Sequence, residues 1–281
     1  MMPGMSLLWK IGIIGFLVLL IFGGGGFAAY ELFFKKPAAK ASAGNQAVVT
    51  PTPDPGPALL SQAQQLMAKG DSEHGKELLI SIFQSFPASS KAAEAKKIVG
   101  DLNVRQFFSD ANPTKTNYVV ARGDSIARIA GKTKAAPELI FKANGLESLM
   151  LHPGQVLIIP SGQFVLQISL ANKDLTLLNH GVFFKWYQPT DYHLPANVTP
   201  GQYKIIGKDA WSAGTPVAFG GKNYLGSSRW IVLNTGSITI YSEPNPTNPN
   251  VQKPKSGIEI SADEMEELYS LVGKDSPVTI R

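Results

Sequence analysis

The chain has 281 residues, of which 44% are hydrophobic and 17% charged, and it contains no cysteine. This length predicts two or three small domains, and the composition excludes a largely disordered chain and a polytopic membrane protein. The lack of cysteine excludes disulfides, thiolate metal sites and a cysteine nucleophile. Because the four histidines show no metal-ligand spacing, we expect neither a metal nor a cofactor.

The basic excess lies in the first half of the chain. Residues 1–160 carry 16 Lys and Arg against 11 Asp and Glu, whereas residues 161–281 carry 10 of each. The excess is thinly spread, without the dense basic stripe and interleaved aromatic residues of a nucleic-acid site. We therefore expect no nucleic-acid partner and interpret these charges as solvated surface with some attraction to anionic membrane or wall polymer.

Residues 1–36 are predicted to form an N-terminal membrane anchor, with a transmembrane helix at about residues 10–30. Ile11 to Tyr30 are 20 consecutive uncharged residues, which at ~1.5 Å each match a hydrocarbon core of ~30 Å. A cleaved signal peptide is the alternative, although Ala39-Lys40-Ala41 is a weak cleavage site. Lysines after the apolar run favour a cytoplasmic C-terminal side, whereas the domains that follow favour the periplasm or cell-wall space.

Residues 37–57 are rich in Ala, Pro, Thr and Gly and predict an extended linker. Residues 58–110 then show helical periodicity in three apolar runs, separated at Gly70-Asp71 and Pro87, with the third helix opening at Ser89-Ser90. The alternation of small and large apolar residues resembles a tetratricopeptide-type (TPR-like) unit, which alone buries little core. A helical spacer or oligomerisation element and a groove for an envelope protein partner both stay open.

Residues 117–160 predict the order β-α-α-β. Tyr118 to Val120 read as the first strand and Val156 to Ile159 as the last. Asp124 or Ser125 can cap the first helix, and the second helix ends at Asn144-Gly145.

This segment resembles a LysM domain, through the runs "GDSIARIA" at 123–130, "LIFKANGL" at 139–146 and "LHPGQVLIIP" at 151–160. LysM modules bind glycans that contain N-acetylglucosamine, chiefly peptidoglycan, and the resemblance implies a groove between the loops at 123–126 and 144–149. Short loops that expose backbone suit acetamido groups. The alternative is a spacer that kept the fold and lost the ligand. The implied glycan contacts are Gly123, Asp124, Ser125, Ile126, Asn144, Leu146 and Leu149.

Residues 162–281 predict a mainly β domain with one C-terminal helix. Short apolar runs with frequent Gly, Pro and Asn between them are typical of strands. Ser261 and Glu264 form a capping box for a helix that ends at Leu271. The predicted strands are 164–168, 175–178, 182–187, 203–206, 230–233, 238–241 and 278–280.

This domain resembles the L,D-transpeptidase catalytic domain, through "TPGQYKI", "YLGSSRWIVL" and the ending "ISADEMEELYSLVGKDSPVTI". Such enzymes crosslink peptidoglycan stem peptides through a cysteine acyl-enzyme, with a histidine as base and an arginine nearby. The resemblance places Gly257 at the cysteine position, Lys255 at the preceding histidine and Glu259 at the arginine. It places Tyr241 at the upstream histidine.

These replacements predict a catalytically inactive domain. Glycine offers no nucleophile, and a phenol with a pKa near ~10 is a poor base at neutral pH. We interpret the four positions as surface or rim residues of a former pocket. Ser256 with Lys255 as its base is one alternative, but neighbouring side chains in a strand point apart. Glu243 with Glu259 as a carboxylate pair for glycoside hydrolysis is another.

Together these segments predict a single-pass, multi-domain envelope protein: membrane helix, TPR-like unit, LysM module (117–160) and L,D-transpeptidase-like domain (162–281). We expect a peptidoglycan-binding scaffold or regulator that is not an enzyme. The alternative is a divergent L,D-transpeptidase-family enzyme that remodels the wall with non-standard residues.

Overall fold

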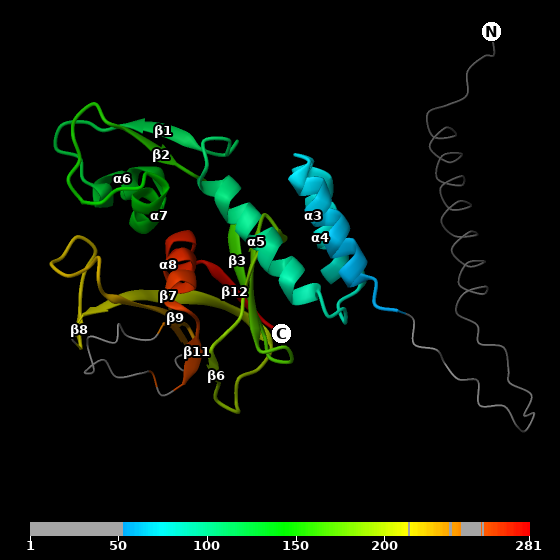
Figure 1. Cartoon of the computed structure of the whole chain (residues 1–281). Helices are drawn as coiled ribbons and strands as arrows, with labels where there is room; N and C mark the ends of the chain where they lie inside the picture. The colour runs from blue at the N-terminus through cyan, green and yellow to red at the C-terminus, as the bar shows by residue number, and fades with distance from the viewer. Residues whose placement is uncertain (1–52, 213, 236–237, 243–253, 255) are drawn as a thin grey trace, which may run out of the picture. The chain divides into compact units, whose positions relative to one another are not determined.

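The computed structural model describes residues 53–212, 214–235, 238–242, 254 and 256–281. The predicted anchor and residues 37–52 of the predicted linker lie outside these residues. Among the helices of the described part, none is both long and apolar enough to cross a bilayer. Residues from Pro53 to Arg281 group into one unit, whose elements are labelled in Figure 1.

The helical segment contains three helices, as predicted: α3 (Gly56–Ala68), α4 (Ser72–Ser85) and α5 (Ala92–Phe108). Their apolar stripes share one core that includes Leu60, Leu79 and Val99. The third helix begins two residues after the predicted Ser90, because Ser90 binds the residues that precede α3. Its N–H and hydroxyl both donate to Asp54 Oδ2, at 2.9 and 2.7 Å, and so fasten the segment that leads into α3.

Helix α5 lies against strand β5 (Val182–Tyr187) of the C-terminal domain. Asn103 Nδ2 donates to the carbonyl oxygens of Phe183 and Phe184, at 3.2 and 2.8 Å. Phe107, near the end of α5, belongs to the core of the C-terminal domain. The helical segment is therefore packed onto that domain and is not a separate spacer.

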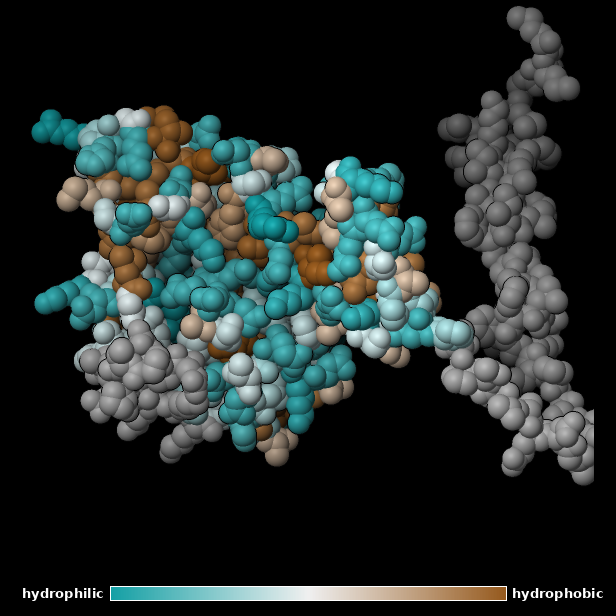
Figure 2. Space-filling model, viewed as in Figure 1, coloured by the Kyte–Doolittle hydropathy of each residue, from teal (hydrophilic) through white to brown (hydrophobic). Residues whose placement is uncertain are grey.

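The predicted β-α-α-β order of the next module is confirmed. Strand β1 (Thr116–Val119) pairs antiparallel with β2 (Val156–Ile159), and the helices α6 (Ile126–Thr133) and α7 (Pro137–Ala143) lie between them in the chain. The module has its own small core, to which Ile126, Ile129 and Leu157 belong. Figure 2 shows that hydrophobic side chains also reach its surface, where Val119 and Val156 are exposed.

Two sets of contacts fix this module to the rest of the unit. Where the chain enters and leaves it, Thr114 Oγ1 donates to the Ser161 carbonyl oxygen at 2.7 Å. Elsewhere α7 packs on α8 (Ala262–Leu271), and Leu139 of α7 is buried in the core of the C-terminal domain. The module is therefore seated on that domain along one helix.

The C-terminal domain is built on a mixed sheet with the strand order β5-β4-β3-β12-β7-β9-β10-β11-β6, and β8 pairs with β7. All seven predicted strands are present, whereas the short strands β6, β8 and β11 were not predicted. The further strands are β3 (Phe164–Ser169), β4 (Asp174–Asn179), β6 (Asp191–His193), β7 (Gly201–Ser212), β8 (Thr215–Pro216), β9 (Ser228–Leu233), β10 (Thr239–Tyr241), β11 (Gly257–Glu259) and β12 (Pro277–Ile280).

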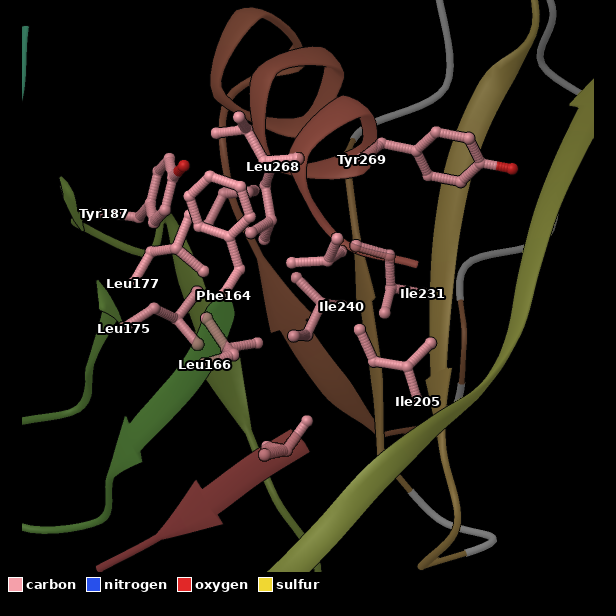
Figure 3. Packing of buried hydrophobic residues seen from close by; sticks show 14 of the residues in the cluster. Phe164, Leu166, Leu175, Leu177, Tyr187, Ile205, Ile231, Ile240, Leu268 and Tyr269 are labelled. Atoms are coloured by element: carbon pink, nitrogen blue, oxygen red, sulfur yellow. The ribbon is translucent and has the colours of Figure 1, made fainter. Parts of the chain in front are cut away.

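Helix α8 covers one face of this sheet. Leu268 points from the helix toward Ile240 and Ile231 of the strands below it (Figure 3), and burial of such apolar residues is the main force that holds the two layers together. At its start, Ser261 Oγ accepts from the Glu264 N–H at 3.4 Å and lies 2.9 Å from Glu264 Oε2. The predicted capping pair is therefore present.

Candidate functional site

Asp124 fastens the first candidate glycan loop from inside. Its carboxylate accepts from Tyr118 Oη at 2.8 Å, the Ala121 N–H at 2.9 Å and Lys132 Nζ at 2.8 Å, and only 3% of its side chain is exposed. Hydrogen bonds from Lys132, the Ala121 N–H and Tyr118 lower the pKa of Asp124 to about 2. Asp124 thus shapes the loop and does not present its carboxylate to a ligand.

The two residues that follow Asp124 are also structural. Ser125, of the two capping candidates, is the N-cap of α6, with its hydroxyl accepting from the Arg128 N–H at 3.3 Å. Ile126 is buried in the module core. Gly123, by contrast, is exposed and has φ +81°, a left-handed conformation that glycine adopts readily.

Asn144 joins the second candidate loop to strand β2. Its Nδ2 donates to the carbonyl oxygens of Ile140 and Ile158, both at 2.8 Å, and its Oδ1 accepts from the Ile158 N–H at 2.7 Å. With both donors and an acceptor used, this side chain holds the loop in place. Its role is therefore to position the loop. The prediction that the second helix ends at Asn144-Gly145 described part of this role.

The structure brings the two loops onto one core. Ile126 from the first loop and Leu146 and Leu149 from the second pack in the same apolar cluster. Leu146 and Leu149 keep part of their surface exposed. Of the seven predicted contacts, Gly123 and Ser125 are exposed and Leu146 and Leu149 are half-buried, whereas the side chains of Asp124, Ile126 and Asn144 are engaged within the module.

The four positions implied for transfer chemistry do not lie on a surface or rim, insofar as the structure describes them. Gly257 is buried and Tyr241 and Glu259 are each 4% exposed, while Lys255 and Glu243 lie outside the described residues. The interpretation as surface or rim residues is therefore wrong for Tyr241, Gly257 and Glu259, and it stays a prediction for Lys255. Strand β11, which carries Gly257 and Glu259, pairs with β10 on one side and β6 on the other and is therefore not an edge strand.

Position 257 has no room for a side chain. A Cβ placed on Gly257 would lie 2.2 Å from the Thr239 carbonyl oxygen and 3.1 Å from Tyr241 Cε1. Two heavy atoms at 2.2 Å overlap. The Thr239 carbonyl oxygen belongs to the backbone, so it can move away only if the two strands separate. The close pairing of β10 and β11 therefore requires glycine here.

A buried ionic cluster joins the module to the C-terminal domain, and sequence analysis did not find it. Glu138 of α7 accepts from Lys208 Nζ at 3.0 Å and from Tyr224 Oη at 2.7 Å. Lys208 and Glu138 have side-chain exposures of 11% and 14%. Burial lowers the pKa of Lys208 and raises that of Tyr224. The signal available in the sequence was Lys208 itself, a charge that interrupts an apolar strand pattern.

Comparison with known families supports the assignment of the module. Residues 118–160 match the LysM domain family model. These residues are a LysM domain. A search of curated protein sequences finds no match to the chain.

Among solved structures, the C-terminal part is similar to L,D-transpeptidases. An L,D-transpeptidase from Mycobacterium smegmatis is 10% identical, with 46% of this chain and 63% of that chain covered and a TM-score of 0.30. One from Mycobacterium tuberculosis H37Rv is 12% identical, with coverages of 47% and 74% and a TM-score of 0.30. L,D-transpeptidase 3 from Mycobacterium tuberculosis, in complex with a faropenem-derived adduct, is 13% identical, with coverages of 60% and 92% and a TM-score of 0.29.

Proposed function

We propose that this protein binds peptidoglycan through its LysM domain. The observation that carries the proposal is the family match at residues 118–160, together with two loops that share one core and leave Gly123, Leu146 and Leu149 accessible. Exposed backbone and small apolar surfaces suit an acetamido group, which needs one donor, one acceptor and a methyl-sized contact.

The C-terminal domain, in this proposal, serves as a scaffold and not as a catalyst. A cysteine acyl-enzyme needs a thiolate and a base, and the chain contains no cysteine. The contact of Gly257 with the Thr239 carbonyl oxygen supports the same view, because it fills the space that a nucleophilic side chain at this position would need. We further propose that residues 1–36 anchor the protein to the membrane and that the LysM domain lies in the periplasm or cell-wall space.

We expect purified peptidoglycan sacculi to retain the full chain. We expect Leu149→Asp to lower the bound fraction about fivefold or more, because a charge at a central apolar contact is among the costlier changes in a binding site. Co-sedimentation with sacculi measures this. Deletion of the domain is a poor control, because Leu139 belongs to the core of the C-terminal domain.

Val156→Asp is the matched control, since Val156 is 56% exposed on β2 of the same domain. It should bind as the unaltered chain does. Equal loss in both variants, or no retention of the unaltered chain, would contradict the proposal.

We expect no covalent adduct when the full chain is incubated with a carbapenem or with a stem-peptide donor, and intact-protein mass spectrometry measures this. Ser256 is the residue to inspect after proteolysis, because it precedes position 257 and carries a hydroxyl. A stoichiometric acyl group on Ser256 would favour a divergent transpeptidase over a scaffold.

A further inference from the structure

A cavity of about 330 Å³ lies between the LysM domain and the loop that joins β8 to β9. Phe141 and Leu146 form its wall on the LysM side, and Phe219, Tyr224 and Leu225 form the wall on the other side. Leu225 is 54% exposed, so this apolar wall is open to solvent.

The cavity is continuous with the second candidate glycan loop. Gly145 and Leu146 of that loop line it. Leu149, in the same loop, places its Cδ1 3.6 Å from the point where a Cβ on Gly220 would stand. A glycan chain that lies on this loop and continues past it would therefore next contact residues of the C-terminal domain.

The chemistry of the lining suits a sugar ring. Phe219 and the two leucines keep part of their apolar surface exposed at the cavity. Tyr224 lies behind them and is 3% exposed, with the Phe219 ring 5.0 Å away at 70° and the Arg229 guanidinium 4.2 Å from its ring centroid. One face of a pyranose is made of C–H groups that pack on such surfaces, while its edge carries groups that hydrogen-bond to polar atoms. The volume is near the lower end for ligand pockets, which suits a single ring.

The charges at the cavity favour a ligand without net charge. Its lining contains two acidic residues, Glu138 and Glu266, and two basic residues, Lys142 and Arg229. Three of these are paired. Glu138 binds Lys208 and Tyr224, and the buried Arg229 has its Nε 3.1 Å from Oε1 of Glu266, whose side chain is 50% exposed. An ionic ligand would compete with these pairs, whereas a neutral one leaves them intact.

We propose that this cavity holds one uncharged sugar ring of a glycan chain whose neighbouring rings lie on the LysM loops. The C-terminal domain thereby lengthens the binding surface of the LysM domain, and the protein prefers longer glycans to short ones. The inference rests on the proposed function, because it assumes that the LysM domain holds the same chain.

Calorimetric titration of the full chain with the disaccharide and the hexasaccharide of N-acetylglucosamine tests this. We expect the hexasaccharide to bind more tightly. In Leu225→Asp its affinity should fall about fivefold, while the affinity for the disaccharide changes by less than about twofold. Leu225→Phe, which keeps an apolar wall, should retain the preference for the longer sugar.

Val182→Asp is the matched control, because Val182 is 67% exposed and lies outside the cavity. Disaccharide binding without any length preference, or an equal loss of both affinities in Leu225→Asp, overturns this inference and leaves the proposed function standing. If the unaltered chain binds neither sugar nor sacculi, both fail. A loss in Leu225→Asp that is confined to glycans with stem peptides assigns the cavity to peptide and overturns the sugar assignment.

Discussion

Replacing Glu138 by alanine is expected to lower the free energy of unfolding by about 3–5 kcal/mol, the usual cost of leaving one charge of a buried pair alone. The Lys208 ammonium loses its carboxylate and the Tyr224 hydroxyl loses its acceptor, and neither regains water while the module stays seated. Urea unfolding followed by tryptophan fluorescence measures the loss.

The pH dependence of this variant has a definite sign. Burial already lowers the pKa of Lys208 below its ordinary value, and removal of Glu138 lowers it further. Because the folded state then binds the Lys208 proton less tightly than the unfolded state, part of the lost stability returns as the pH rises toward the ordinary lysine pKa of ~10.4. Unfolding curves at neutral and alkaline pH measure this, and a deficit that does not shrink on raising the pH would contradict it.

Two controls separate the buried pair from a general effect of charge. Lys204 lies on β7 like Lys208 and forms an exposed ion pair with Asp275, so Lys204→Ala should cost less than about 1 kcal/mol. The double variant Glu138→Leu/Lys208→Met removes both charges and should be far closer to the unaltered chain than Glu138→Ala is. If the double variant loses as much as the single one, packing and not charge explains the effect.

Gly257→Ala is expected to lower the free energy of unfolding by about 3 kcal/mol, at the upper end of the usual cost of overpacking. The added methyl group would overlap the Thr239 carbonyl oxygen, and relief requires that β10 and β11 move apart. Thermal and urea unfolding measure the effect. Gly257→Cys should be destabilised in the same way and should take no acyl group from a carbapenem.

Gly207→Ala is the matched control for this prediction. Gly207 also lies in a strand, β7, but the nearest atom to its added Cβ is Val232 Cβ at 3.5 Å, an ordinary contact. Its change should stay within about 1 kcal/mol. A stable Gly257→Cys that accepts an acyl group would show that position 257 tolerates a nucleophile, contrary to the argument from space.

Most of the fold could be predicted because its signals are local. The order of the LysM domain follows from turn residues and caps that act within a few positions, as at Ser125 and Asn144-Gly145. The helix at Ala262–Leu271 follows from its cap and its apolar stripe. Strands with regular apolar runs, such as β3, were found for the same reason.

The features that were missed depend on contacts between distant residues. Strand β7 was predicted over four residues but extends over twelve, because Lys208 and Asp209 break the apolar pattern. Lys208 is nevertheless buried, since Glu138, 70 positions away, neutralises it. The resemblance to L,D-transpeptidases placed Gly257 at the position of the cysteine nucleophile. Its packing against Thr239 could not be predicted, because it depends on the pairing of β10 with β11.

The attachment of α5 to strand β5 has a mechanical consequence if the protein is attached to the membrane as proposed. The chain enters the described unit next to α3, and α3 is held through α4 and α5 to the sheet that also carries the LysM domain. Tension applied at Pro53 therefore passes through packed helices and strands and not through a slack connector. A ligand held by the LysM domain would therefore be linked to Pro53 through packed secondary structure along the whole path.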